Sequence, residues 1–270
     1  MENNEKHFEF GDNWKDFSGS INTARVEKAE TSLASMLGAD ALKGKTFLDV
    51  GCGSGLFSLA AMRLGAAAVR SLDYDPQSVA TAAALKEKYF PGSDGWRIER
   101  GDALDVPYMA SLGLFDVVYS WGVLHHTGAM WRALGNVAGS VKPGGKLFIA
   151  IYNDQGRKSL YWKAVKKAYN LLPGALKYLV LAPVFLRIWA VPTVKDVLAG
   201  KPFRTWKDYA ANRGMSPWHD VVDWVGGYPF EVAKPSEITE FYEKLGFKLE
   251  KLITCGEGYG NNEFVFNKKA

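Results

Sequence analysis

The stretch TFLDVGCGSG, residues 46–55, joins a predicted strand to a loop with a glycine at every second position. A short apolar run closed by glycines fits a fully buried parallel strand better than a helix. Gly51, Gly53 and Gly55 lack a Cβ, so the chain can turn sharply and a ligand can lie against the backbone. Dinucleotide-binding loops have the spacing G-x-G-x-x-G, but Leu56 stands where their last glycine belongs. The loop is therefore a site for another ligand or a structural turn, and the neighbouring segments decide between the two.

Acidic residues follow the next two predicted strands. The segment VRSLDYDPQSV, residues 69–79, predicts a second strand that ends at Asp73, about 20 residues beyond the loop, where related folds bind ribose hydroxyls. Dinucleotide enzymes share that acid, so it does not by itself identify the ligand. The segment WRIERGDALDV, residues 96–106, predicts a third strand followed by Asp102. FDVVYSWGVLHHT and VKPGGKLFIAIYN then predict a fourth strand, a turn and a fifth strand.

These five segments, in this order, resemble the motifs of the class I S-adenosylmethionine (SAM)-dependent methyltransferases. The pattern Asp-x-Gly-x-Gly-x-Gly of residues 49–55 is similar to the family's first motif, which holds the amino-acid end and the ribose of SAM. The resemblance covers residues 45–153 closely and the C-terminus loosely. It implies that Asp73 binds the ribose and Asp102 the adenine amino group. The expected cofactor-binding residues are Asp49, Gly51, Gly53, Gly55, Asp73, Tyr74, Asp102, Ala103, Ser120 and Trp121.

The order of the predicted elements indicates an α/β fold. Strands near residues 46–50, 69–74, 96–101, 115–120 and 146–151 alternate with helical segments, which is typical of a parallel sheet with helices on both faces. FKLEKLITC and NEFVFNK are predicted to pair as a hairpin, and they match the family's antiparallel last strand. We therefore expect a Rossmann-like, seven-stranded, mostly parallel sheet with a helical insertion. The expected division is an N-terminal cap and helix at 1–44, a SAM-binding core at 45–155, a helical acceptor-binding lid at 156–234, and a C-terminal helix and hairpin at 235–270.

The N-terminal segment contains two predicted features. A helix from about Asn22 places four apolar residues at helical spacing and should pack on the core through Val26, Ala29, Leu33 and Leu37. Before it, Trp14 and Phe17 are expected either to close over the cofactor or to anchor the terminus. The first residues lack the apolar run of a signal peptide, and two cysteines among 270 residues do not support a disulfide framework. Both observations favour the cytoplasm.

The insertion is predicted to be helical and basic, and to determine which acceptor molecule the protein binds. In its first helix, Tyr161 and Tyr169 are expected on the apolar face and Lys163, Lys166 and Lys167 on the exposed face. LKYLVLAPVFLRIWAV, residues 176–191, is predicted to be too short and too interrupted to span a bilayer, which predicts no transmembrane segment. It lies either in a membrane interface, as a peripheral contact, or against the sheet as a lid.

Charge is unevenly distributed along the chain. Residues 156–213 contain twelve Lys or Arg and two Asp, a net charge of about +10, whereas the remainder has 21 basic and 27 acidic residues, about −6. A basic segment with aromatic residues suits an anionic partner, such as a phosphate-bearing sugar or lipid carrier, an acidic membrane or RNA. The alternative is a solvated lysine face on amphipathic helices.

Methyl transfer to oxygen needs a proton acceptor, for which histidine is suited near neutral pH. His125 and His126 follow the fourth strand, and His219 lies in WHDVVDWVGGYPFEVA, residues 218–233. We expect His126 or His219 to act as the base, although hydrogen bonding within the fold is the alternative for the His-His pair. A metal site built from His125, His126 and Asp220 would follow no recognised spacing, so none is predicted. The expected acceptor-binding residues are His125, Trp218, Asp220 and Tyr228.

The resemblance and the residues together predict a SAM-dependent methyltransferase that releases S-adenosylhomocysteine. The expected acceptor is an oxygen of a small or carrier-linked molecule of sugar, quinone or lipid type, with an anionic molecule as one option, and oxygen is favoured because candidate bases are present. Two alternatives remain open: an RNA (tRNA) base methyltransferase, suggested by the basic insertion, and a SAM-binding protein without catalysis.

Overall fold

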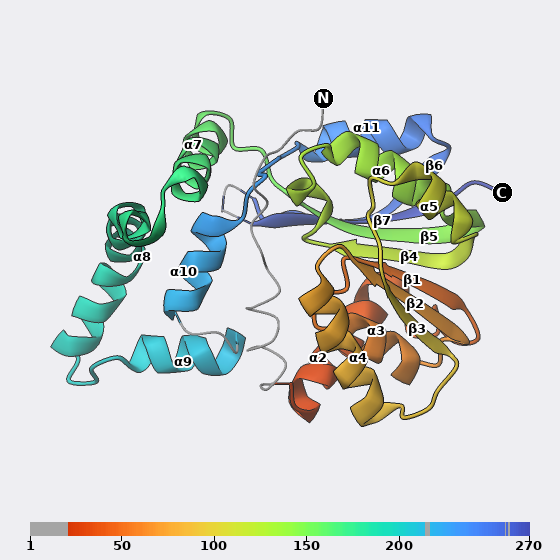
Figure 1. Ribbon diagram of the computed structural model, residues 1–270, viewed down its shortest axis with the longest axis horizontal. Coiled ribbons are helices and arrows are strands. Elements are labelled where there is room, and N and C mark those ends of the chain that lie inside the picture. Colours follow the sequence, from red (N-terminus) through yellow and green to blue (C-terminus); the bar gives the residue numbers. More distant parts are fainter. Residues whose placement is uncertain (1–20, 214–216, 257, 259) are drawn as a thin grey trace.

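The structure is a computed structural model that describes residues 21–213, 217–256, 258 and 260–270; within α9 and α10 the side chains of 210–213, 219 and 223 are also outside the description. The chain forms an α/β lobe and a smaller helical lobe (Figure 1). The predictions for Trp14 and Phe17 fall outside the described residues.

A seven-stranded sheet forms the centre of the α/β lobe, with the strand order β3-β2-β1-β4-β5-β7-β6. β7 runs antiparallel to β5 and β6, and the other neighbours are parallel. This arrangement confirms the predicted sheet. The strands are β1 (Thr46–Val50), β2 (Ala68–Asp73), β3 (Trp96–Arg100), β4 (Phe115–Trp121), β5 (Val141–Tyr152), β6 (Phe247–Ile253) and β7 (Asn261–Lys268).

The fifth strand begins earlier than predicted. β5 starts at Val141 rather than near residue 146, because Val141 pairs with Phe115 before an irregularity in the register of β4 and β5. Along its second half β5 pairs with β4 on one side and β7 on the other, and residues 147–151 are buried. A central strand of this kind has no solvent-facing side, which explains its continuous apolar sequence.

Helices cover both faces of the sheet and enclose two apolar cores (Figure 1). The N-terminal helix was predicted correctly: Asn22 caps it by accepting the N–H of Arg25 at 3.1 Å, and its predicted apolar residues are all buried. One face carries α2 (Thr23–Leu37), α3 (Leu56–Arg63) and α4 (Pro76–Tyr89), and the other carries α5 (Val106–Ser111), α6 (Met130–Gly139) and α11 (Pro235–Lys244).

The helical lobe is inserted between β5 and α11 and has a core of its own. It leaves and re-enters the α/β lobe at one point, where the N–H of Ala233 donates to the carbonyl of Tyr152 at 3.1 Å. The core includes Trp162, Trp189 and Val225. The predicted packing of the apolar segment as a lid against the sheet is therefore wrong. The helices are α7 (Arg157–Leu171), η2 (Gly174–Lys177), α8 (Tyr178–Leu198), α9 (Arg204–Arg213) and α10 (Pro217–Gly226).

Two expectations about this lobe need correction. On α7 the buried residues are Ser159, Trp162, Lys166 and Tyr169, whereas Tyr161 is exposed, because the bulkier Trp162 takes the core position and turns the helix. The expectation that the apolar segment is too short to span a bilayer is wrong. The helical stretch Gly174–Leu198 contains a part with a mean hydropathy of 1.5, and it is long and apolar enough to cross a bilayer on those two criteria alone.

Candidate active site

The glycine loop connects β1 to α3, and at two of its positions neighbouring residues leave no room for a side chain. The N–H groups of Gly51 and Cys52 both donate to the carbonyl of Leu72 on β2, at 2.8 and 3.0 Å. A Cβ on Gly51 would lie 2.4 Å from Val123, and one on Gly55 would lie 2.9 Å from Ala82. Both residues also have positive φ, 78° and 79°. Close packing against neighbouring elements therefore requires glycine at these positions, in addition to the predicted approach of a ligand.

Asp73 ends β2 and is held by the glycine loop. Its Oδ2 accepts the N–H of Gly53 at 2.9 Å, and its Oδ1 accepts the N–H of Asp75 at the same distance. Burial raises the pKa of Asp73, although these N–H groups oppose the increase. A carboxylate has about four lone-pair sites, so Asp73 can accept further hydrogen bonds from a ribose diol.

Asp49 belongs to a buried polar chain beneath the loop. The Ser58 hydroxyl donates to Asp49 Oδ2 at 2.6 Å, and Ser58 in turn lies 2.6 Å from the Ser71 hydroxyl. The chain ends at the indole N–H of Trp96, which donates to Ser71 at 2.8 Å. Burial raises the pKa of Asp49 to about 7, and the charge of Asp73 adds to the increase. Asp49 therefore takes up a proton just below neutral pH.

The remaining predicted cofactor residues differ in what they contact. Asp102 follows β3, and its Oδ1 accepts the N–H of Leu104 at 2.8 Å; the next residue, Ala103, is buried. Tyr74 is exposed beside Asp73. Ser120 is fully buried and donates to the carbonyl of Val50 at 2.8 Å, so its hydroxyl links β4 to β1. Trp121 donates its indole N–H to Glu263 at 3.0 Å.

His125 and His126 lie in η1 (Leu124–His126), just beyond the end of β4. His125 is fully buried; its Nδ1 accepts the N–H of Tyr152 at 3.4 Å, so Nε2 carries the proton and has no hydrogen-bond partner among the described residues. His126 Nδ1 lies 2.7 Å from the carbonyl of Pro229, to which it can only donate. Burial, followed by the charge of Lys166, lowers the pKa of His126 to about 3. Both rings are therefore neutral at physiological pH.

An aromatic and cationic cluster that the sequence analysis missed surrounds these histidines. The ring centroid of Tyr152 lies 4.0 Å from that of His125 and 5.7 Å from that of Trp224. Lys166 is fully buried, with Nζ 4.3 Å from the centroid of Trp224 and donating to its carbonyl. The signal available in the sequence was the helical spacing of Trp162, Lys166 and Tyr169. This spacing places Lys166 on the same face of α7 as the two aromatic residues.

The predicted acceptor residues on α10 and beyond pack within the helical lobe. Trp218 stacks on Tyr178 with ring centroids 6.0 Å apart, and Asp220 accepts the hydroxyl of Tyr209 at 2.7 Å. Tyr228 is buried in the lobe core. His219 lies on α10, but its side chain is outside the described residues, so its role as a base stays a prediction. In the described part of the chain no three His, Cys, Asp or Glu side chains are grouped to hold a metal ion.

A groove of ≈ 350 Å³ lies between α6 and α7. Its walls combine the aromatic rings of Trp131 and Phe230 with Leu160 and Lys163. The groove borders the segment that holds the histidines, since Pro229 contacts His126 and the N–H of Glu231 donates to the carbonyl of His125 at 3.0 Å. The lining also contains the acids Asp154 and Glu231, so a ring or chain that carries hydrogen-bond donors suits the groove better than one that carries a negative group.

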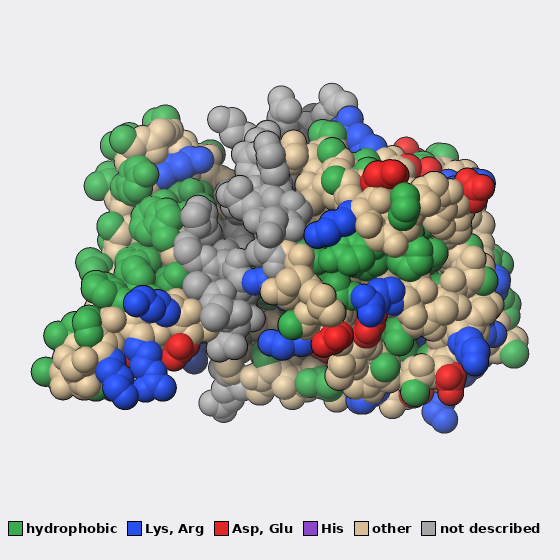
Figure 2. All heavy atoms as spheres, turned by 90° about the horizontal axis from the view of Figure 1, so that it is seen from below, with side chains coloured by type: hydrophobic (Ala, Val, Ile, Leu, Met, Phe, Trp, Pro, Cys, Tyr) green, Lys and Arg blue, Asp and Glu red, His purple; other side chains and the backbone are tan. Residues whose placement is uncertain are grey.

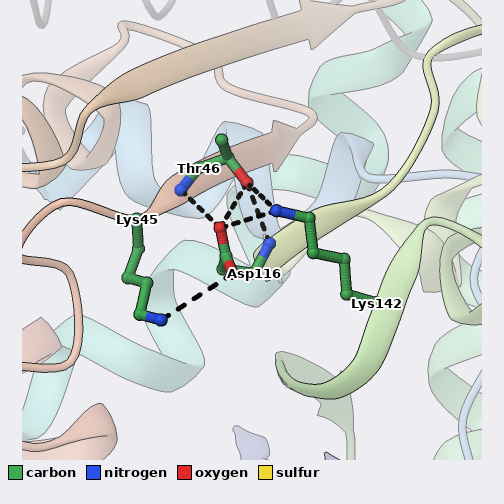
Figure 3. Close-up of polar contacts among 4 residues, drawn as sticks. All are labelled: Lys45, Thr46, Asp116 and Lys142. Atoms are coloured by element: carbon green, nitrogen blue, oxygen red, sulfur yellow. Dashed lines mark hydrogen bonds and ion pairs between the residues drawn. The ribbon is translucent and has the colours of Figure 1, made fainter.

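The opposite, amino-terminal edge of the sheet carries a different acid. Asp116 Oδ2 accepts the N–H and hydroxyl of Thr46 at 2.9 and 2.7 Å and Lys142 Nζ at 2.9 Å (Figure 3). Burial acts to raise the pKa of Asp116, but these donors outweigh it and hold the pKa well below its usual range. Asp116 is therefore a fixed anion that ties β1 to β4 and β5, far along the strands from the glycine loop.

The carboxyl-terminal edge fits SAM. Asp49, Asp73 and Asp102 lie on or just after β1, β2 and β3, which are neighbours in the sheet. SAM presents a sulfonium, an ammonium, a ribose diol and an adenine amino group, all of them cations or hydrogen-bond donors, and three carboxylates supply the matching acceptors. This strand order and this edge define a class I SAM-dependent methyltransferase domain, with SAM as its cofactor.

Comparison with known proteins places the domain within the chain. A family model described as a methyltransferase domain matches residues 48–149. The ubiquinone biosynthesis O-methyltransferase of Parvibaculum lavamentivorans is 37% identical over 107 residues, 40% of each chain. That of Coxiella burnetii is 29% identical over 162 residues, 57% of this chain and 60% of the relative. The chain thus spans 40% and 60% of the length of these two curated relatives.

A solved structure has the same fold over nearly the whole chain. Magnesium protoporphyrin IX methyltransferase from Synechocystis, with S-adenosylhomocysteine bound, superimposes with a TM-score of 0.57 at 16% identity, covering 96% of this chain and 94% of that one. Residues 48–149 therefore match a methyltransferase domain, and the solved structure shows that the fold of the whole chain is that of a SAM-dependent methyltransferase. The matched region ends before the helical lobe begins at α7.

Proposed function

We propose that this chain transfers the methyl group of SAM to an oxygen of a small or carrier-linked acceptor of quinone or lipid type. The observation that carries the proposal is the joint position of three carboxylates and the His125–His126 pair, all at the carboxyl-terminal ends of β1 to β4. The similarity to relatives named ubiquinone biosynthesis O-methyltransferases supports methylation of an oxygen on a quinone-type acceptor.

Methyl transfer to oxygen requires the protein to align the acceptor oxygen with the methyl group of SAM and to provide a proton acceptor. Bound SAM supplies an electrophilic methyl on its sulfonium, so in-line positioning of the acceptor oxygen contributes most of the rate. The new C–O bond forms as the C–S bond breaks, and the hydroxyl proton passes to a base. The neutral ring of His126 is our candidate acceptor for that proton, and burial, which lowers its pKa to about 3, makes it a weak base.

The groove between α6 and α7 supports the choice of acceptor class. Trp131, Leu160 and Phe230 present apolar walls, beside Lys163 and the acids Asp154 and Glu231. This composition suits a hydroxylated aromatic ring or an isoprenoid-like chain better than a free sugar.

The test is turnover of the His126→Ala variant, with hydroxylated quinone-like acceptors as substrates. Loss of a general base typically lowers the rate by a factor of about 100 to 10,000, and SAM affinity should be retained. The His219→Ala variant provides the comparison, since both residues were candidates. Near-normal turnover by both variants would exclude either histidine as the base.

A second function is favoured by the charge of about +10 on residues 156–213, which suits RNA as an anionic acceptor. Labelled SAM added to cell extract separates the possibilities. Label in small molecules or lipids supports O-methylation of a carrier-linked acceptor, label in tRNA supports base methylation, and SAM binding without transfer of label to any fraction would indicate a non-catalytic protein.

A further inference from the structure

Helix α8 is apolar on the side that faces solvent as well as on the side that packs in the lobe. Its inner face buries Leu181, Val184 and Trp189. On the outer side Leu179 is 69% exposed and Leu186 is 62% exposed. A helix that is apolar all round belongs in an apolar environment on both sides, yet only one side of α8 has a protein partner among the described residues.

The exposed apolar residues of α8 form one continuous strip. At 100° per residue they fall within an arc of roughly 140°, on the side opposite Leu181. The strip, here called the α8 outer face, consists of Leu179, Leu186, Val191, Val194, Val197 and Leu198, all of them more than half exposed. Soluble proteins rarely leave such a contiguous apolar surface without a partner.

Basic residues border this face. Lys177 precedes α8, Lys195 is exposed beside the strip, and Lys201 and Arg204 follow the helix, whereas Arg187 is exposed within the arc of the strip itself. Figure 2 shows hydrophobic side chains spread over this lobe, with Lys and Arg side chains gathered at its outer end.

The acids of this region are already engaged. Asp196 is buried and accepts the N–H and the hydroxyl of Thr205 at 2.7 and 2.8 Å. Asp208 lies 3.4 Å from Arg204. The surface around the outer face is therefore apolar with a positive border.

We infer that the α8 outer face docks onto the surface of an anionic lipid bilayer, with the helix lying in the plane of the interface. Leucine and valine side chains would enter the acyl region, while the long stems of Arg187 and Lys195 reach back to the phosphates. Each basic residue near an anionic surface adds favourable attraction. The inference rests on the surface of the lobe and holds whichever acceptor the enzyme methylates.

Two other arrangements fit the structure less well. Spanning the bilayer would place Arg187, near the middle of the apolar stretch, in hydrocarbon and would remove Leu181 and Trp189 from the lobe core. Pairing of two copies through the outer face would bring together two segments that each carry about +10 charges. A negatively charged, apolar surface is the partner that satisfies both properties of the face.

Docking in this way would place the bilayer beside the helical lobe, with α10 between α8 and the α/β lobe (Figure 1). The helical lobe joins the α/β lobe at Tyr152, at the end of β5, and Tyr152 packs on His125. The helical lobe therefore connects the docked face to the carboxyl-terminal edge of the sheet.

Vesicle sedimentation of the full-length protein tests the inference. Vesicles of phosphatidylcholine alone are compared with vesicles that also contain phosphatidylglycerol. The apolar variant is Leu179→Gln with Leu186→Gln, and its matched control is Leu114→Gln with Leu245→Gln, two exposed leucines of the α/β lobe. The charge variant is Arg187→Glu with Lys195→Glu, matched by Lys28→Glu with Lys248→Glu. Circular dichroism and SAM affinity confirm that each variant is folded.

We expect binding to the anionic vesicles and much weaker binding to the neutral ones. Both lobe variants should weaken anionic binding at least about tenfold, while both controls bind as the parent protein does. Absence of sedimentation with anionic vesicles, or equal binding by lobe and control variants, would overturn the inference. A dimer in light scattering that Leu179→Gln with Leu186→Gln converts to monomer would also overturn it, in favour of self-association. SAM affinity is measured separately, so failure to dock is distinct from failure to bind the cofactor.

Discussion

The α/β lobe and the helical lobe each enclose an apolar core, but they differ in what lies outside it. In the α/β lobe the helices cover a sheet, and most of their outward residues are polar. In the helical lobe α7 and α8 expose leucines and valines, while a lysine, Lys166, is buried in the core region. The helices of the α/β lobe are therefore covered mainly by polar residues, whereas the helical lobe carries the apolar surface that we propose docks onto a bilayer.

The largest effect is expected at Lys166. The variant Lys166→Glu would bury a carboxylate against the ring and carbonyl of Trp224, which should destabilise the helical lobe by about 3 to 5 kcal/mol. Thermal unfolding followed by tryptophan fluorescence should show a separate early transition. The neighbouring Lys167→Glu, which is exposed, should leave unfolding unchanged. Loss of SAM affinity in Lys166→Glu would show instead that the two lobes fold as one unit.

The next effect concerns the SAM edge of the α/β lobe. Asp73→Ala should weaken SAM binding by about 1 to 3 kcal/mol, because ribose hydroxyls and the Gly53 N–H lose their acceptor. Asp105→Ala is the control: Asp105 caps α5 by accepting the N–H of Tyr108, so this change should lower stability by about 1 kcal/mol and spare SAM. Calorimetry that finds equal SAM affinity in both variants would remove Asp73 from the cofactor site.

A smaller effect should appear in the pH dependence of SAM binding. Burial raises the pKa of Asp49 to about 7, so the folded protein holds this proton below neutral pH. A bound cation favours the ionised carboxylate, and SAM affinity should therefore fall as pH decreases from about 8 to 6, by up to about tenfold per pH unit. Asp49→Asn should reduce the slope. A slope that is the same in both proteins would place the titrating group elsewhere.

The smallest effect is expected at the opposite edge of the sheet. Asp116→Asn should lower the free energy of unfolding by about 1 kcal/mol at neutral pH, because Lys142 loses its charged partner. The folded pKa of Asp116 is depressed, so this stability is present above its unfolded pKa of about 4 and is lost as pH falls through the folded value.

Urea unfolding at neutral and acidic pH should therefore show the gap between the parent protein and Asp116→Asn closing in acid. Glu240→Gln on α11, where Glu240 forms an exposed pair with Lys244, should make no measurable difference at either pH. A gap for Asp116→Asn that persists in acid would contradict the electrostatic account.

Prediction from the sequence succeeded where the signal is local. The glycine loop, the strands and the helix from Asn22 follow from patterns of neighbouring residues, and the structure confirms them. Prediction failed on α7, where helical spacing allowed two apolar faces that differ by one residue, and the choice of Tyr161 over Trp162 placed Lys166 on the wrong side. It failed again on α8, where Pro183 and Pro192 lie inside one continuous helix.

The sequence by itself determined the class of the domain, the order of its strands and the acids at their ends, because each depends on residues close together in the chain. Only the tertiary structure decided which of these residues meet. It joined His125 to Tyr152, set Lys166 against Trp224 and left the α8 outer face uncovered, since such contacts depend on how separate helices pack. Leucine and valine residues are buried in β5 but exposed in α8. Whether such a residue is buried depends on which other segments of the fold pack against it.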